Sequence, residues 1–260
     1  MLHDLFTFRG APQRSPEIII GMAVSVLLVA LWQVSATAGW TNPKFLPPPT
    51  DVLVALWTQL TTQNLLWHAW VSTERVWLAF ALSAVVAIPV GMLMSSYRVI
   101  GASIEPIVDF IRYLPVPALV PLSIIWFGIG EETKIFLLWL GTFFQLVLLV
   151  ADDMRRVPQE YVEAAYTVGA RPRQILTDVA FRAMLPSLVD NLRITLGWCW
   201  TYLIIAEIVA ADSGLGFVIW TARRYVKTPE VLSGVVVIGI IGLVTDQLIR
   251  VLHRRWFKYL

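Results

Sequence analysis

The sequence is poor in charged residues and in cysteine. Only 15% of its 260 residues are Asp, Glu, Lys or Arg, whereas 57% are hydrophobic. A soluble domain carries about 25% charged residues, so the composition excludes an ordinary soluble protein and indicates an integral membrane protein. The single cysteine, Cys199, excludes an internal disulfide.

Motifs for nucleotide binding and hydrolysis are also missing. No Gly-x-x-x-x-Gly-Lys-Ser/Thr phosphate loop occurs, so we do not expect this chain to bind ATP itself. Neither His-Glu-x-x-His nor Gly-x-Ser-x-Gly occurs, and the three histidines are scattered. The pair Asp152-Asp153 is better explained as a solvated turn than as an acidic catalytic pair. We therefore predict no catalytic residue and no metal site, and an intramembrane enzyme is the weakest alternative.

Long hydrophobic runs are what the chain has in abundance. Roughly 20 apolar residues in a helix cross a bilayer core of about 30 Å. We expect an all-α integral membrane protein with about six transmembrane helices, at about residues 17–38, 70–95, 106–130, 135–151, 191–211 and 231–248. Residues 1–16 are predicted to be a cytoplasmic segment, and residues 17–260 the transmembrane domain. Thr50 or Asp51 can cap an amphipathic helix at the outer surface, or a plain connecting helix.

The third hydrophobic run is interrupted by proline. Pro115, Pro117 and Pro121 lie within seven residues, and proline disrupts a helix interior. Irregular backbone at membrane depth is tolerated where protein or a watery cavity satisfies its polar groups, and in many transporters it marks the binding site. A kinked packing helix is the alternative. The candidates for a translocation path through the third and fifth runs are Leu119, Ser123, Thr195 and Thr201.

Lysine and arginine are distributed unevenly between the two sides. With a cytoplasmic N-terminus, thirteen lie on the inner side and five on the outer side, while Arg75 and Arg112 fall within spans. Positive residues favour the cytoplasmic side. Both termini and the loop of about residues 152–190 are therefore predicted to be cytoplasmic.

This loop has the pattern of two short helices joined by a corner. Ala164 and Ala165 lie on one apolar face of the first helix, and Gly169 follows where a left-handed C-terminal cap is favoured. Pro158 suits the first position of that helix, and Pro172 can start the next one. Small residues on such a face predict a docking surface for a soluble partner.

Glu163-Ala164-Ala165, followed after three residues by Gly169, resembles the EAA loop of ABC importer permeases. The Ile-x-Leu-Pro element of that family is degraded here, although Leu185-Pro186 follows slightly later. The stretches 46–49 and 112–130 resemble the branch that carries nitrate, sulfonates, taurine or bicarbonate. The resemblance implies a type I ABC importer permease fold. It assigns contact with the ATPase to Glu163, Ala164, Ala165 and Gly169.

The resemblance also implies partners and a location. It predicts a homodimer in the bacterial inner membrane, surrounded by lipid, with separate ATPase subunits that bind ATP and Mg and a periplasmic substrate-binding protein. No cofactor is expected in this chain, and no nucleic acid partner.

The alternative function is an ion-coupled secondary transporter, which usually places several ionisable groups deep in the membrane. The sequence offers mainly Glu207. This carboxylate either accepts hydrogen bonds from the turn at Ser213-Gly214 and fixes the end of its helix, or forms part of a periplasmic gate.

Overall fold

The computed structural model describes residues 14–210 and 212–258, and these contain helices and no strand. The helices in order are α2 (Arg14–Thr37), α3 (Pro49–Thr62), α4 (Leu65–Ser96), α5 (Arg98–Ile111), the 3₁₀ helix η1 (Val116–Leu119), α6 (Val120–Phe127), α7 (Glu131–Arg155), α8 (Gln159–Thr167), α9 (Pro172–Gln174), the π-helix η2 (Ile175–Ala180), α10 (Phe181–Ala210), α11 (Leu215–Arg224) and α12 (Thr228–Trp256). The all-α expectation is confirmed. Most of the predicted segment 1–16 lies outside the described residues.

Fewer helices than expected have a composition suited to crossing a bilayer. Among the described residues, α2, α4, α7 and α12 are long and apolar enough, and the bent pair α5–α6 adds a fifth span. The predicted span 191–211 lies in α10, a helix of 30 residues that also carries Asp190, Arg193 and Glu207. Counted by length and composition over the described residues, the expected six spans become four or five.

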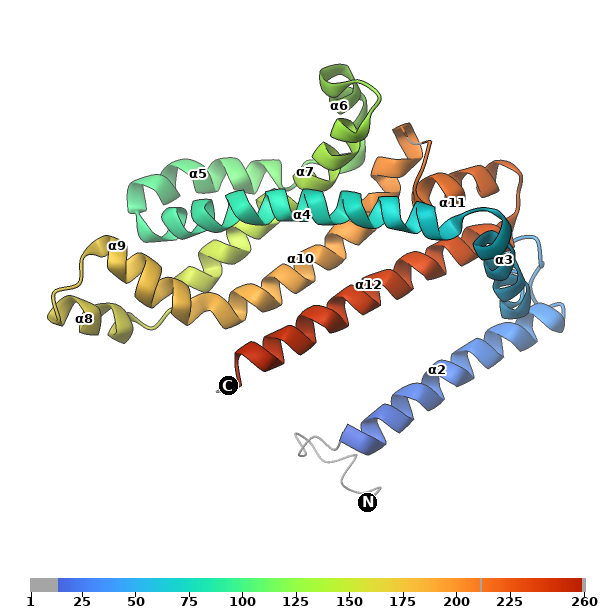
Figure 1. The fold of residues 1–260 in the computed structure, drawn as a ribbon, viewed down its shortest axis with the longest axis horizontal. Coiled ribbons are helices and arrows are strands. Elements are labelled where there is room, and N and C mark those ends of the chain that lie inside the picture. The colour runs from blue at the N-terminus through green and yellow to red at the C-terminus, as the bar shows by residue number, and fades with distance from the viewer. Residues whose placement is uncertain (1–13, 211, 259–260) are drawn as a thin grey trace.

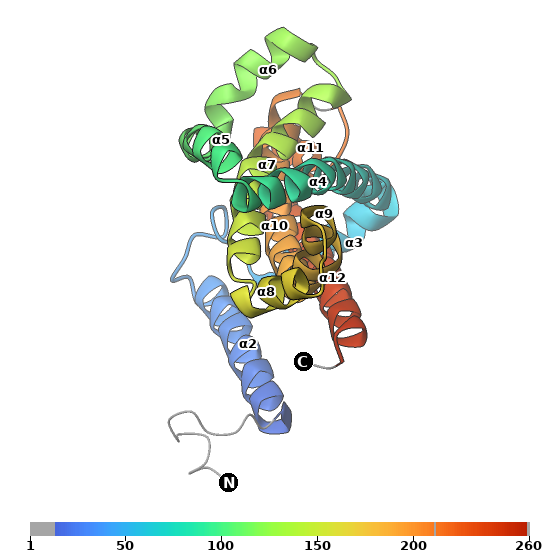
Figure 2. The same ribbon diagram turned by 90° about the vertical axis from the view of Figure 1, so that its left-hand side faces the viewer.

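The proline-rich third run is sharply bent, as predicted. The helices Arg98–Ile111 and Val116–Phe127 meet at 88°, and Figure 2 shows α5 and α6 running in different directions from the break. The helical part begins earlier than expected, because α5 starts at Arg98 and continues through Pro106. The break itself falls at residues 112–115 and includes the first of the clustered prolines, Pro115.

Helices α4, α7 and α10 form the packed centre of the molecule. Between helices in a membrane, small residues allow the close approach that drives packing. A Cβ atom on Gly91 of α4 would lie 2.6 Å from the carbonyl oxygen of Val147 in α7. A Cβ atom on Gly141 of α7 would likewise lie 2.6 Å from the ring of Tyr202 in α10. Both helix pairs therefore touch where glycine removes the side chain.

Helix α3 connects the first span to this bundle. It begins at Pro49 with Pro48 at the N-cap, so the cap expected at Thr50 or Asp51 is wrong. Proline suits the first helical position because its φ angle is already helical and its missing N–H has no helical partner. Gln59 on the buried face of α3 accepts a hydrogen bond from Ser233 of α12 at 2.6 Å. This contact fixes α3 against the N-terminal part of α12.

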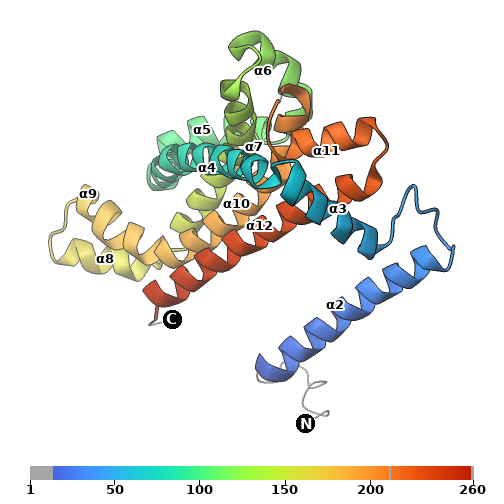
Figure 3. The ribbon, with the colours of Figure 1, turned by 45° about the vertical axis from the view of Figure 1, so that its right-hand side comes forward.

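The long helices place the loops at two opposite ends of the molecule. Figures 1 and 3 show α8, α9, the C-terminal end of α12 and the first turns of α2 at one end. Helices α3 and α11 lie at the other end, and α2 stands apart from the bundle. We call the end with α8 the loop end and the end with α11 the opposite end.

Candidate functional site

The loop between α7 and α10 has the local geometry that its sequence predicts. Gly169 has φ +82°, the left-handed conformation expected for a helix cap. The N–H of Gly169 donates to the oxygen of Tyr166 at 2.9 Å, and the N–H of Ala170 donates to the oxygen of Ala165 at 3.0 Å. These two bonds form a Schellman motif. Pro172 starts α9 as predicted, whereas Pro158 is the residue before α8 rather than its first.

The four residues assigned to the ATPase contact differ in exposure. Glu163, Ala164 and Gly169 are exposed, whereas Ala165 is only 8% exposed. An open groove runs between α8 and the π-helix η2. Its lining residues are Tyr161, Ala164, Ala165, Val168, Gly169, Ala170, Gln174, Asp178 and Val179. The role of the loop in ATPase contact stays a prediction, and of the four assigned residues Glu163, Ala164 and Gly169 are at the surface.

A second polar site lies at the opposite end of the bundle. Arg75 of α4 is 2% exposed and donates to two carboxylates. Its Nε and Nη2 atoms reach the carboxylate oxygens of Glu131 at 2.6 Å each, and Nη1 reaches Glu207 at 2.7 Å. Lys134 also donates to Glu131, at 2.8 Å. We call Arg75, Glu131, Lys134 and Glu207 the charge cluster; its two cations balance its two anions.

The carboxylate of Glu207 holds the turn that leads into α11. It is 1% exposed. It accepts hydrogen bonds from the hydroxyl of Ser72 at 2.7 Å and from the N–H of Gly216 at 2.7 Å. The hydroxyl of Ser72 in turn accepts the N–H of Leu215 at 2.8 Å. Partially positive N–H groups at the start of a helix favour a nearby anion, so the carboxylate is stabilised from both α4 and α11.

Glycine is required where the turn passes the carboxylate. Gly214 has φ +106°, and a Cβ atom there would overlap the carboxylate of Glu207. The N–H of Gly214 donates to Nδ1 of His68 at 3.1 Å. The predicted glycine turn is thus present, and Glu207 lies at the end of its helix. Its backbone donor is Gly216, whereas the carbonyl and hydroxyl of Ser213 both accept from Arg75.

Sequence reasoning missed the partner of Glu207. In the sequence Arg75 falls within a hydrophobic run, and no partner is predicted for it. A signal was available, because an arginine inside a hydrophobic run needs an acidic partner. The sequence does not say which carboxylate this is, since Glu131 and Glu207 lie 56 and 132 residues away.

The candidates for a translocation path are not equally accessible in this structure. Ser123 and Thr195 are buried, and their hydroxyls donate to the carbonyls of Val120 and Asn191. Leu119 is half-buried and Thr201 is exposed. Their assignment to a path stays a prediction, with Leu119 and Thr201 as the members within reach of solvent.

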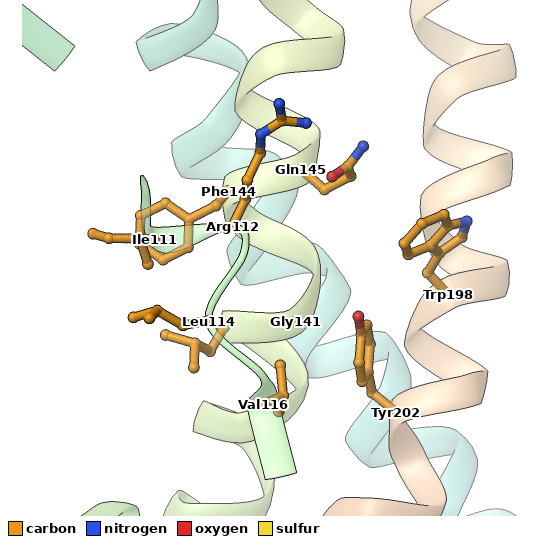
Figure 4. A pocket seen from close by; sticks show the side chains of 10 residues that line it. Ile111, Arg112, Leu114, Val116, Gly141, Phe144, Gln145, Trp198 and Tyr202 are labelled. Carbon is orange, nitrogen blue, oxygen red and sulfur yellow. The ribbon is translucent and has the colours of Figure 1, made fainter. Parts of the chain in front are cut away.

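A small pocket lies beside this region, at the break in the bent span. Figure 4 shows its side chains coming from three segments: the break, α7 and α10. The polar ones are Arg112, Gln145, Trp198 and Tyr202. Metal binding has no candidate here or elsewhere in the described part of the chain, where no group of three or more His, Cys, Asp or Glu side chains is placed to hold an ion.

Comparisons with known proteins agree on the family. The family model described as "Binding-protein-dependent transport system inner membrane component" matches residues 84–258. The taurine transport system permease protein TauC of Escherichia coli is 35% identical over 246 residues, covering 93% of this chain and 90% of that protein. The bicarbonate transport system permease protein CmpB of Synechococcus elongatus is 28% identical over 258 residues, with the same two coverages.

Solved structures show the same fold. A chain of the MetNI methionine ABC transporter, in an inward-facing conformation, has a TM-score of 0.61 and 23% identity, covering 74% of this chain and 98% of that one. A chain of an amino acid ABC transporter has a TM-score of 0.62 at 14% identity, covering 77% and 98%. The chain belongs to the family of inner membrane components of binding-protein-dependent transport systems, the ABC importer permeases, which act with separate ATPase and substrate-binding subunits.

Proposed function

We propose that this chain is the membrane-spanning subunit of an importer for a small sulfonate or oxyanion, such as taurine, another alkanesulfonate, nitrate or bicarbonate. The observation that carries the proposal is similarity over about nine-tenths of the chain to permeases named for taurine and bicarbonate. The exposed loop between α7 and α10 supports it, because a permease without a nucleotide site needs a surface for its ATPase.

The proposed assembly has two copies of this chain, two ATPase subunits and one binding protein. ATP and Mg bind in the ATPase subunits, and no cofactor binds here. A second copy is supported by the exposed face of α10 formed by Ile194, Trp198 and Thr201, which share one side of the helix. Exposed apolar residues along α2, such as Ile18, Leu27 and Leu31, fit contact with lipid.

The proposed location is the inner membrane, with both termini and the α8–α9 loop in the cytoplasm. The charge distribution supports the cytoplasmic side, and the arrangement of the helices supports a shared side for both termini and the loop. Thirteen of eighteen assigned lysines and arginines fall on that side of the sequence-based topology. The first turns of α2, the last turns of α12 and the loop lie at the same end of the structure (Figure 3).

The mechanism that follows is alternating access driven from the loop end. Movement of the ATPases pulls on α8, which packs against η2 and so against the helix that continues into α10. Helix α10 carries Glu207, which is bonded to α4 through Arg75 and to the start of α11 through Gly216. A movement of the loop thus reaches the turn at the opposite end through one helix.

An ion-coupled secondary transporter is the alternative. It would need an ionisable group inside the membrane that exchanges a proton or an ion with water. Glu207 is the main candidate, yet it is 1% exposed and bonded to Arg75, Ser72 and Gly216. This arrangement favours a structural role for Glu207 and hence the ATP-driven importer.

Uptake by a reconstituted complex tests the proposal. The chain is purified with its ATPase, placed in vesicles with ATP inside and supplied with its binding protein outside. We expect uptake of labelled taurine or bicarbonate that requires hydrolysable ATP. Uptake that follows a proton or sodium gradient without ATP would instead establish the secondary transporter.

A further inference from the structure

The pocket at the break of the bent span is built from side chains with a common chemistry. Arg112 follows the end of α5, Gln145 belongs to α7, and Trp198 and Tyr202 belong to α10. Figure 4 shows the Gln145 amide and the Tyr202 hydroxyl extending into the space between α7 and α10. Each of the four side chains can donate a hydrogen bond, and no carboxylate lines the pocket.

Three of these donors have no partner within the protein. Among the residues that the structure describes, the side chains of Gln145, Trp198 and Tyr202 make no hydrogen bond. The polar atoms of Gln145 and Tyr202 are open to solvent, so water can satisfy these donors and a ligand can displace that water. Trp198 is 48% exposed, which leaves the pocket open toward the exposed face of α10.

Arg112 supplies a positive charge that is only partly neutralised. Its Nε atom lies 3.1 Å from Asp109, and Nη2 donates to the hydroxyl of Tyr113 at 2.9 Å. A guanidinium group has five N–H donors, so these two contacts leave about three of them for another acceptor. Asp109 reduces the net charge at the site, which favours weak and reversible binding of an anion.

We propose that this pocket is a transit site for the anionic headgroup of the substrate, a sulfonate or a small oxyanion. The inference rests on the proposed function for the identity of the ligand. The guanidinium of Arg112 binds two oxygens of such a group side by side. The amide of Gln145 and the hydroxyl of Tyr202 donate to the remaining oxygen, and the rings of Phe144 and Trp198 contact the carbon chain.

The size of the pocket agrees with a transit site. Its cavity volume is about 40 Å³, enough for about three water molecules. This room matches the three oxygens of a sulfonate group rather than a whole alkanesulfonate. A translocation pathway has to bind its substrate strongly enough to admit it and weakly enough to release it, and a pocket that holds the headgroup alone agrees with weak, reversible binding.

Direct binding tests the site, and uptake tests the function separately. The purified complex of permease and ATPase, without the binding protein, is titrated with methanesulfonate and with taurine by calorimetry. We expect weak binding by the wild type and about a tenfold or greater loss in Arg112→Gln, because a charge-assisted pair is removed. Arg98→Gln is the matched control, since Arg98 is an exposed arginine of the same bent span outside the pocket.

Two further variants keep the test decisive if Arg112→Gln fails to assemble. Tyr202→Phe removes a hydroxyl and Gln145→Leu removes a side-chain amide, and neither changes a charge. Each should weaken binding several-fold while leaving the melting temperature of the complex unchanged. Binding that is absent in the wild type, or equal in wild type and pocket variants, would overturn the site. If the complex binds methanesulfonate or taurine normally but shows no ATP-driven uptake, the result would support the site and contradict the proposed function.

Discussion

The charge cluster and the loop between α7 and α10 differ in how their charged side chains are buried and paired. In the cluster, Arg75 and Glu207 are buried and each is bonded to several partners within the chain. In the loop, Glu163 and Arg171 are exposed and form no ion pair with any described residue. The cluster is satisfied within the chain, whereas the loop leaves charged groups at the surface, where water or a partner can solvate them.

This difference has an energetic basis. An ion pair buried in a protein contributes little by itself, yet losing one partner leaves an unpaired buried charge and costs about 3–5 kcal/mol. An exposed charge costs almost nothing to leave unpaired, since water solvates it. Substitutions in the cluster should therefore act on folding, and substitutions on the exposed loop surface should act on partner binding.

The largest effect is expected for Arg75→Ala. This change leaves Glu207 buried without its cation, so the folded state should lose about 3–5 kcal/mol. We expect a large fall in folded protein after mild detergent extraction, measured by size-exclusion profile and melting temperature. The double variant Arg75→Leu/Glu207→Leu removes both charges and should recover part of the loss. Wild-type stability of Arg75→Ala would contradict the structural role of the cluster.

A smaller effect is expected for Glu207→Gln. Glutamine keeps an oxygen that accepts from Arg75 and Ser72, but its amide cannot accept the N–H of Gly216 with the other atom. The loss of one charge-assisted bond costs about 1.5–3 kcal/mol. We expect near-normal uptake for Glu207→Gln and reduced expression for Glu207→Ala, as for a residue that fixes a helix end. Normal assembly of Glu207→Gln with altered basal ATP hydrolysis would indicate a gate instead.

The smallest effect on stability is expected for Ala164→Arg. Ala164 is exposed at the groove, and surface changes usually alter stability by less than about 0.5 kcal/mol. The variant should fold normally and lose co-purification with the ATPase or substrate-stimulated ATP hydrolysis. Ala165→Arg is the comparison, because Ala165 is buried and its replacement should disturb the loop itself. If Ala164→Arg still co-purifies with the ATPase and keeps full substrate-stimulated ATP hydrolysis, the ATPase does not dock on this face of α8.

Local features of this fold were predictable from the sequence. The bend near Pro115 and the left-handed cap at Gly169 depend on proline and glycine, whose backbone preferences are set by the residue itself. The turn at Gly214 was located for the same reason. In each case the physical cause lies within a few residues of the feature.

Features that depend on distant contacts were not predictable in the same way. Arg75 and Glu207 are 132 residues apart in the sequence. The pattern of a helix can indicate that a residue faces inward, but it does not identify the residue that it contacts. The burial of Ala165 depends on η2, which the sequence did not indicate.

The π-helix η2 carries one extra residue between the loop and the rest of the molecule. Backbone helix runs from Pro172 through η2 to Ala210, about 58 Å at 1.5 Å per residue. A π-helical turn holds one residue more than an α-helical turn, and each residue of an α-helix advances by about 100°. Six residues of π-helix and five of α-helix turn through nearly the same angle, so deleting one residue of Ile175–Ala180 should let η2 close as an α-helix with Glu207 still facing Arg75. Deleting a residue from the α-helical part of the rod would instead turn one end against the other by about 100°. The short segment η2 therefore takes up one extra residue without changing the direction in which the α8 surface points.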